Sequence, residues 1–424
     1  MRRVHFAAAA ASLVLAAGLM VACEQAQQAE APAPDTAAPA ANVTVFEGAR
    51  LIVGDGSAPI ENGVLVVDGD TIVAAGAAGA VQAPAGATSV DLTGKTVMPA
   101  IVDVHTHLSQ TREELILDLR RRAYYGVGAA MSMGTDSGEL LPVRDEVIPG
   151  AARYLSAGRG ITRPEPGRGE VPYWINTVEE ARQAVQELAA QEVDLVKIWV
   201  DDRNDMYEKL TTELYGAIID EAHMHGLRVT AHIFELEDAK GLLGAGIDAF
   251  AHGVRDMDVD DEFMDLVGQN PDLVLNPNLP GRGEAMDYAW LETSLPTEDF
   301  ADLQEGNTDN PGQQEAFGIQ ARNLARMNAA GVTIVLGTDG NTPWAPHEEM
   351  ENMVAAGMTP ADVIVAATGD AAEFLRIADS GTLAAGKSAD FIVLDANPLD
   401  DITNTRRISA VYLRGAEVDR AAAP

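Results

Sequence analysis

The chain has 424 residues, 47% of them hydrophobic, so it can form one large α/β domain, a smaller second domain and a sizeable core. Its 29 basic and 65 acidic residues give a formal charge of −36, which argues against nucleic-acid binding, because that function needs a basic surface. The single cysteine excludes an intrachain disulfide, and we expect catalysis without a thiol.

The N-terminus has the pattern of an export signal. Two arginines precede the apolar stretch 6–22, which predicts a signal peptide over residues 1–22. Its end, Met-Val-Ala-Cys, resembles a bacterial lipobox, in which Cys23 receives a lipid and becomes the mature N-terminus. A plain signal peptide or a short membrane anchor is the alternative. Residues 23–42 are rich in Ala, Gln and Pro and predict a disordered tether. We therefore expect a periplasmic lipoprotein held on a bacterial membrane, the outer membrane in the simplest case.

Both ends of the remaining chain predict short β-strands. From 43 to 96, apolar runs alternate with turns, and Asp68-Gly69-Asp70 is typical of a hairpin. The same texture returns over 379–424. The simplest arrangement is one small β-sandwich built from both chain ends.

Between these ends, residues 97–378 alternate apolar runs with helical patterns, which favours a parallel sheet covered by helices. Helices are expected over 177–190 and 211–225. Eight strands in this length predict a (β/α)8 TIM barrel. A doubly wound open sheet is the alternative, but no Gly-rich phosphate fingerprint follows an early strand. The expected strands lie near 97–105, 127–133, 152–158, 193–200, 227–233, 247–251, 272–276 and 332–338.

His105-Thr106-His107, at the end of an apolar run, is the most informative motif. Residues two apart in a strand project to the same face, so two imidazoles could bind one metal ion from the same side. In TIM barrels the active site lies at the C-terminal ends of the strands. Four more candidate ligands each lie at or near the end of an apolar run, namely Lys197, His232, His252 and Asp339.

The candidate ligands differ in the chemistry that they offer. Burial lowers the pKa of a lysine, and the neutral amine of Lys197 could react with carbon dioxide to give a carbamate that bridges two metal ions. The alternative is a barrel lysine paired with a carboxylate. His232 and His252 offer neutral nitrogen donors, although each alone is more often a core histidine. Asp339 offers a carboxylate, with a turn or helix-cap role as the alternative.

Four segments together resemble the amidohydrolase superfamily, in particular the branch with imidazolonepropionase-like proteins and metal-dependent dipeptidases. The entry motif covers 94–107, with Ala100 where glycine is usual, and the other segments cover 359–361, 366–372 and 386–394. The similarity extends from about residue 43 to the end of the chain.

The resemblance implies a binuclear metal site. His105, His107 and Asp339 would hold the first ion, His232 and His252 the second, and carbamylated Lys197 would bridge them. It implies two divalent ions, with zinc expected, although the sequence does not distinguish zinc from manganese, iron or cobalt. The related mononuclear enzymes lack a lysine ligand on the fourth strand, so Lys197 favours the two-metal branch.

Two such ions lower the pKa of a water between them, so that hydroxide is available to attack a polarised carbonyl. We expect Asp339 to act as general base and then as general acid toward the leaving nitrogen. The expected reaction is hydrolysis of an amide bond in a small molecule, a dipeptide or an N-acyl amino acid. Alternatives are hydrolysis of a lactone or ester at the same site, a mononuclear enzyme acting on a cyclic amide or amidine, and a binding or scaffold protein on a degenerate barrel.

Substrate recognition is expected in the loops after the strands. Six arginines follow strands and could bind a substrate carboxylate, or could pair with Asp201, Asp202, Asp256 or Glu284. The stretch 277–317 is expected to be a long loop that forms a lid or substrate wall, and His347 could touch substrate. A homo-oligomer is compatible with the sequence. The arginines are Arg159, Arg163, Arg168, Arg203, Arg255 and Arg282.

Overall fold

The computed structural model describes residues 42–424. The expected signal peptide, Cys23 and the expected tether up to residue 41 lie outside these residues. In the part that is described, no helix is long and apolar enough to cross a membrane.

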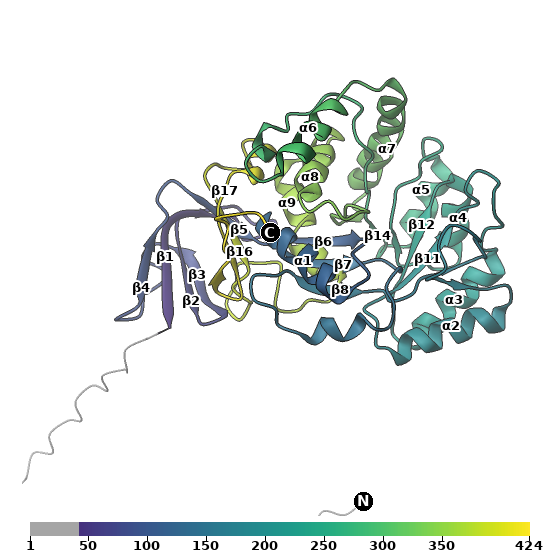
Figure 1. Cartoon of the computed structure of the whole chain (residues 1–424), viewed down its shortest axis with the longest axis horizontal. Helices are drawn as coiled ribbons and strands as arrows, with labels where there is room; N and C mark the ends of the chain where they lie inside the picture. Colours follow the sequence, from purple (N-terminus) through teal and green to yellow (C-terminus); the bar gives the residue numbers. More distant parts are fainter. Residues whose placement is uncertain (1–41) are drawn as a thin grey trace, which may run out of the picture. The chain divides into compact units, whose positions relative to one another are not determined.

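Both chain ends contribute to one eight-stranded sheet, as expected (Figure 1). Its strands run in the order β18-β17-β16-β5-β1-β2-β3, and β4 pairs with β1. Gly69, with φ 60°, forms part of the predicted hairpin turn between β2 and β3. The strands are β1 (Val43–Leu51), β2 (Ile60–Asp68), β3 (Thr71–Ala77), β4 (Thr88–Asp91), β5 (Thr96–Pro99), β16 (Phe391–Leu394), β17 (Ile408–Leu413) and β18 (Ala416–Glu417).

The alternating residues of β1 and β2 enter two separate apolar clusters. Val45 and Val66 belong to one cluster, whereas Phe46 and Leu65 belong to the other. Because successive side chains of a strand point to opposite faces, both faces of this strand pair are covered. This layering is compatible with the expected β-sandwich, which stays a prediction.

The expected strand 97–105 is two strands, which corrects the prediction. β5 pairs with β16 in the terminal sheet, whereas β6 (Ile101–Thr106) pairs with β7 (Val127–Ser132). The break falls at Ala100, whose N–H donates to the carbonyl of Asp390 at 3.0 Å. A continuous apolar run hides such a break, because both strands are buried. The strand that carries the histidine motif therefore continues directly from the terminal sheet.

The central part of the chain is built from parallel strands alternating with helices. All eight expected strands are present, divided between a sheet β6-β7-β8 and a sheet that contains β11 to β15. Main-chain bonds join the ends of this set: Val104 N donates to Leu336 O, and Thr338 N donates to His105 O. β8 and β11 are not paired with each other, so a continuous closed barrel stays a prediction. The remaining strands are β8 (Arg153–Ser156), β11 (Val196–Val200), β12 (Val229–Ile233), β13 (Ala249–Phe250), β14 (Val274–Leu275) and β15 (Thr333–Ile334). Two short strands that were not expected extend the second sheet: β9 (Ile161–Thr162) pairs with β11, and β10 (Tyr173–Trp174) pairs with β9.

The two expected helices are confirmed to within one residue. Thr177 caps α2 (Val178–Ala190) through a capping box with Glu180. Thr211 caps α3 (Thr212–Met224) by accepting from Leu214 N. The other helices are α1 (Arg112–Tyr124), α4 (Leu236–Gly244), α5 (Asp261–Gln269), α6 (Thr297–Glu305), α7 (Pro311–Ala329), α8 (Ala345–Ala355), α9 (Pro360–Ala366) and α10 (Gly369–Phe374), with short 3-10 turns η1 (Leu141–Asp145), η2 (Ala289–Leu291) and η3 (Ile402–Arg406).

The stretch 277–317 is not the structureless loop that was expected. It contains η2, α6 and the start of α7. An aromatic cluster attaches it to the rest of the fold: the ring centroid of Trp290 lies 6.1 Å from that of Tyr125, and Tyr125 also contacts Trp344 at 5.9 Å. The polar composition of this stretch is typical of a loop, but a few buried aromatic side chains suffice to order it.

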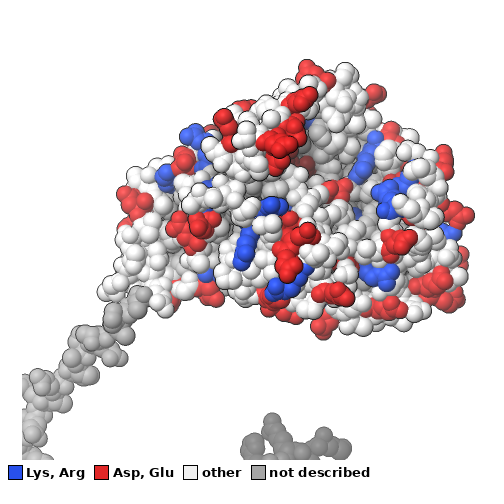
Figure 2. Space-filling view, in the orientation of Figure 1, with Lys and Arg blue, Asp and Glu red and all other residues white. Residues whose placement is uncertain are grey.

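On the face drawn in Figure 2, acidic side chains are spread over many elements, with basic side chains among them.

Candidate metal centre

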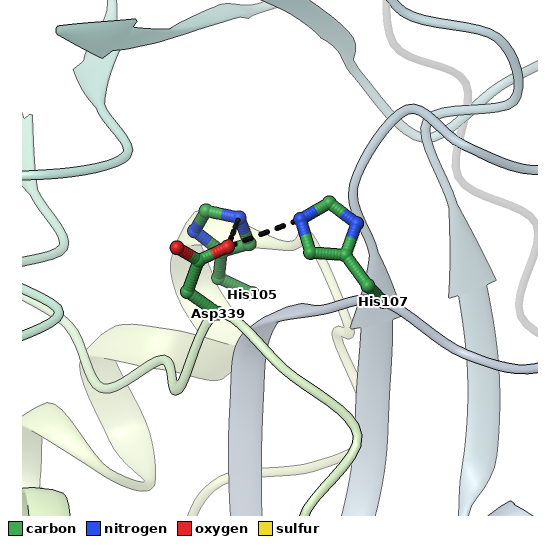
Figure 3. Close-up of side chains that lie close together, drawn as sticks. All are labelled: His105, His107 and Asp339. Atoms are coloured by element: carbon green, nitrogen blue, oxygen red, sulfur yellow. Dashed lines mark hydrogen bonds and ion pairs between the residues drawn. The ribbon is translucent and has the colours of Figure 1, made fainter. Parts of the chain in front are cut away.

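His105, near the end of β6, and His107, just after it, both approach one oxygen of the Asp339 carboxylate (Figure 3). Oδ1 of Asp339 lies 3.2 Å from Nε2 of His105 and 3.0 Å from Nε2 of His107. One potential ligand atom of each residue lies within 4.8 Å of the others. The two histidines therefore project to the same side, as the sequence predicts. Asp339 reaches them from the segment after β15, the last strand of the other sheet.

A buried ion pair holds the segment that carries Asp339. Oδ2 of Asp103 accepts from Thr338 Oγ1 at 2.8 Å and from Arg122 at 2.9 Å. Arg122 also donates to the carbonyl of Gly340 at 2.8 Å. Asp339 itself has φ 51°, a conformation that is uncommon outside glycine and Asn/Asp. Thr338 and Gly340, on the two sides of Asp339, are thus both held by the ion pair of Asp103 and Arg122. Sequence reasoning did not single out Asp103 or Arg122.

His252 and His232 extend the cluster. Nε2 of His252 lies 3.6 Å from Oδ2 of Asp339, and its ring centroid lies 5.1 Å from that of His105. The ring of His232 lies 4.6 Å from that of His252. However, Nε2 of His232 lies 2.8 Å from both Asp201 Oδ2 and Arg203 Nη1. An ion bound through Nε2 of His232 would have to displace this contact with Arg203.

Lys197 is fully buried within β11, and no hydrogen-bond partner for its Nζ is present among residues 42–424. Burial lowers the pKa of this amine to about 7, although Asp339 acts in the opposite direction. Gly134, with φ 87°, gives the side chain room, because a Cβ there would lie 2.9 Å from Lys197 Cγ. The alternative of a lysine paired with a carboxylate is not what the structure shows, and the neutral amine is accessible near neutral pH.

The three buried imidazoles of the cluster, those of His105, His232 and His252, are held in their neutral form. Burial lowers the pKa of His105 and of His232 to about 3, and that of His252 well below its usual value. Burial acts to raise the pKa of Asp339, but the contacts with His105 and His107 outweigh it and hold the pKa well below the usual range. Neutral imidazoles beside an ionised carboxylate are the donor set of a divalent cation.

Three buried atoms give a direct test of whether a cation fits. Nε2 of His105, Nε2 of His252 and Nζ of Lys197 are buried and make no well-formed hydrogen bond within the described range, although both imidazole nitrogens lie within 4 Å of the Asp339 carboxylate. Buried polar atoms without partners are costly, and they are rare in native proteins unless water or an ion satisfies them. The chain's own residues therefore fit divalent cations at this position.

A cavity of about 580 Å³ opens beside the cluster and is lined by His232, Asp339 and three of the six predicted arginines. Arg203 pairs with Asp201 at 2.5 Å, as the alternative interpretation had it, and Arg168 pairs with Glu165. Arg255 is partly buried, and no acidic side chain in the described chain lies within ion-pair distance of it.

The other three arginines are engaged away from this cavity. Arg159 donates to the carbonyl of Val171, Arg163 pairs with Glu208, and Arg282 pairs with Glu351. The predicted substrate contact of His347 is wrong: its side chain is buried between Thr405 and the carbonyl of Tyr125.

Comparison with known proteins decides the family. The model of the amidohydrolase family matches residues 96–418. The chain belongs to the amidohydrolase family. The family and the relatives together show that the protein is a hydrolase acting on carbon–nitrogen bonds. They also show that it has a TIM-barrel-like α/β fold.

Similar proteins are found both among curated sequences and among solved structures. An imidazolonepropionase of Halobacterium salinarum is 28% identical over 405 residues, which cover 83% of this amidohydrolase and 91% of the relative. An imidazolonepropionase of Streptomyces coelicolor is 26% identical over 361 residues, covering 80% and 86%. Among solved structures, a putative prolidase from Bifidobacterium longum aligns with a TM-score of 0.74 and 28% identity, covering 90% of this chain and 96% of that one. A Xaa-Pro dipeptidase with bound methionine, 23% identical with a TM-score of 0.71 over 88% and 99% of the chains, shares the fold.

Proposed function

We propose that this amidohydrolase is a binuclear metal enzyme that cleaves the amide bond of a dipeptide or an N-acyl amino acid. The observation that carries the proposal is the convergence of His105, His107 and Asp339 beside the buried, unpartnered nitrogens of His252 and Lys197 within residues 42–424. The putative prolidase and the Xaa-Pro dipeptidase support a peptide-like substrate by their names.

The residues divide into two ligand sets. His105, His107 and Asp339 would hold one ion, and His232 and His252 the other. The neutral Nζ of Lys197 would add to the carbon of carbon dioxide and lose one proton, which gives an anionic carbamate oxygen donor to both ions. Zinc is the expected metal, because it is bound by nitrogen and carboxylate donors. When bound, the ions would polarise the scissile carbonyl and lower the pKa of a nearby water.

Asp339 is the residue that we propose for proton transfer. It is ionised at neutral pH because its pKa is low, and one of its oxygens contacts both His105 in β6 and His107 just after it. It can therefore accept the proton of the attacking water and return that proton to the leaving nitrogen, as a general base and then a general acid.

Arg255 is the residue that we propose for recognition of a substrate carboxylate. It lines the same cavity as Asp339 and makes no ion pair with any described residue. A carboxylate on the substrate would give this guanidinium the charge-assisted hydrogen bonds that it lacks. The exposed side chains of Met206 and Phe234 also line this cavity, which favours an apolar group on the substrate.

The substrate proposal is tested with zinc-loaded protein on N-acyl amino acids, dipeptides, the corresponding neutral amides and lactones. For Arg255→Met we expect KM to rise about 10- to 100-fold for carboxylate-bearing substrates, as for loss of a charged hydrogen bond. KM for neutral amides should not change, and the surface variant Arg322→Met should behave as wild type. An equal change for both substrate classes would contradict the role of Arg255. Preferential turnover of lactones would favour the ester-hydrolase alternative.

The number of metal ions is tested by metal analysis in the presence of bicarbonate. We expect two ions per chain in the wild type, loss of metal and activity together in Lys197→Ala, and partial rescue by short carboxylic acids. Full metal occupancy in Lys197→Ala would rule out the bridging role.

A mononuclear enzyme acting on a cyclic amide is the second candidate. The contact between Arg203 and His232 favours it, because that contact occupies one of the two ring nitrogens that His232 could offer to a second ion. The imidazolonepropionase relatives also point in this direction. One ion per chain, with turnover of cyclic amides and not of dipeptides, would establish this candidate.

We also propose that the protein is a periplasmic lipoprotein anchored through Cys23. The support is the sequence alone, in which the single cysteine follows an apolar segment at the position that a lipobox requires.

A further inference from the structure

Asp118 is a buried residue of α1 that contacts both segments of the first ligand set. Its Oδ2 accepts from Ser109 N at 3.0 Å and from Asn341 Nδ2 at 2.7 Å. Ser109 follows His107 by two residues, and Asn341 follows Asp339 by two residues. One carboxylate oxygen therefore joins two segments whose ligands are 232 residues apart in the chain.

The contact lies where the main chain no longer holds these segments together. Main-chain bonds join them as far as His107, whose N–H donates to Gly340 O at 3.2 Å. Within the described residues, no main-chain hydrogen bond links 108–110 with 341–343. The side chain of Asp118 makes the next connection instead.

A second contact from the same helix lies on the other side of the ligands. Arg122, one turn after Asp118, binds Asp103, and the carboxylate of Asp103 also accepts from Thr338. Asp103 and Thr338 come just before the ligands of their segments, whereas Asp118 acts just after them. The first ligand set is thus flanked on both sides by contacts of α1.

The burial of Asp118 indicates that these hydrogen bonds determine its position. A carboxylate in the interior is costly unless it is paired or hydrogen-bonded. Asp118 is 6% exposed, and no basic side chain of residues 42–424 forms an ion pair with it, because Arg122 pairs with Asp103. Its oxygens can only accept, so the N–H groups of the two segments supply what this carboxylate needs.

We propose that Asp118 is a positioning residue that sets the separation of His107 and Asp339. Nε2 of His107 and Oδ1 of Asp339 lie 3.0 Å apart, so a shift of either segment changes the distance between two donors of one set. Ligands that are held in place before the ion arrives bind it more tightly, because no ordering has to occur on binding.

The inference rests on the proposed function only in calling His107 and Asp339 metal ligands, so its test begins without metal. Hydrogen exchange at the N–H of His107 reports whether the two segments stay together. Asn341→Ala releases one segment and leaves the bond from Ser109 to Asp118 in place. We expect faster exchange at His107 in this variant, with wild-type exchange in α3 as the internal reference.

Zinc binding is the second readout, measured by titration of the metal-free chain against a chelator of known affinity. Loss of an outer partner of a metal site weakens binding by about 10- to 100-fold, and we expect this range for Asn341→Ala and Asp118→Ala. Asp118→Asn keeps an oxygen acceptor and should restore wild-type affinity. The matched control is Glu113→Ala, which removes an exposed carboxylate from the same helix and should change neither readout.

A purely structural role of Asp118 predicts a different pattern. It would lower the melting temperature of metal-free Asp118→Ala but leave the zinc affinity of the folded protein unchanged, and this result would overturn the inference. If Asp118→Ala does not fold, Asn341→Ala decides, because Asn341 is exposed. Unchanged exchange at His107 in Asn341→Ala would also overturn it. If exchange responds as expected but the wild type binds no zinc, the proposed function fails and the role of Asp118 in joining the segments stands.

Discussion

The residues of the candidate metal centre differ in how far the sequence alone identifies them. The spacing of His105 and His107 predicts a shared face, and a lysine inside the apolar run of β11 predicts a buried amine. Both expectations are met. Asp118 carries no such signal, because an acidic residue of a helix is usually exposed, and one of its two partners, Asn341, is distant in the chain.

At the residue scale, the sharpest prediction concerns Asp339. Replacing Asp339 by Asn removes the proton acceptor while keeping the shape of the side chain. We expect kcat to fall by about 100- to 10,000-fold, the range for loss of general acid–base catalysis. Steady-state kinetics with parallel metal analysis measure this, and Asp258→Asn on the surface is the control. Near-wild-type turnover with retained metal would contradict the assigned role.

Elements depend on contacts that cross the chain, and these are harder to predict. The caps of α2 and α3 are local, so Thr177 and Thr211 are identified from a few neighbouring residues. The break at Ala100 is not local, because it depends on β5 pairing with β16 near the other end of the chain. The order within 277–317 likewise depends on aromatic contacts with distant helices.

The buried pair of Asp103 and Arg122 supports the segment around Asp339. Arg122→Met would leave the Asp103 carboxylate buried without its cation, and we expect a loss of about 3–5 kcal/mol of unfolding free energy. Chemical denaturation measures this. Arg120→Met, on the exposed face of the same helix, should change stability by less than about 0.5 kcal/mol. Equal stability of the two variants would show that the ion pair of Asp103 and Arg122 does not stabilise the fold.

Glu349 predicts a pH dependence of stability. Burial raises its pKa from 4.5 to about 8, so between these values the folded state binds a proton that the unfolded state releases. The contribution of Glu349 to stability therefore falls as pH rises through this window. Glu349→Gln removes this fall, so the variant should gain stability relative to wild type from pH 4.5 to 8 and then level off.

Urea denaturation at several pH values measures this difference. Each pKa unit corresponds to about 1.4 kcal/mol, which predicts a gain of a few kcal/mol for the full shift. The exposed variant Glu315→Gln should show no such trend. A constant difference between Glu349→Gln and wild type would mean that Glu349 does not titrate in this window.

For the whole molecule, the sequence predicts the fold class better than it predicts which strands pair with each other. Alternating strands and helices suffice for a TIM-barrel-like fold, and the strand positions agree with the structure to within a few residues. The pairing between the sheets depends on hydrogen bonds such as that from Val104 to Leu336, which no local pattern encodes.

Membrane attachment is the prediction that belongs to the complete chain. Cys23 lies outside the described residues, so the test is cellular: in a bacterial host, Cys23→Ser should move the protein from the membrane to the soluble fraction and abolish labelling with a fatty acid. Unchanged membrane association, without lipid labelling of the wild type, would favour an uncleaved anchor instead.

The division of the first predicted strand at Ala100 has a consequence for biosynthesis. β5, which leads into His105, finds its partner β16 only after nearly the whole polypeptide has left the ribosome. His105 likewise receives the main-chain bonds from Thr338 and Asp339 only at this late stage, so the site is completed late in maturation. In the proposed metal enzyme, the ions would then come from the compartment where folding ends, whatever metals surround the chain while it is being translated.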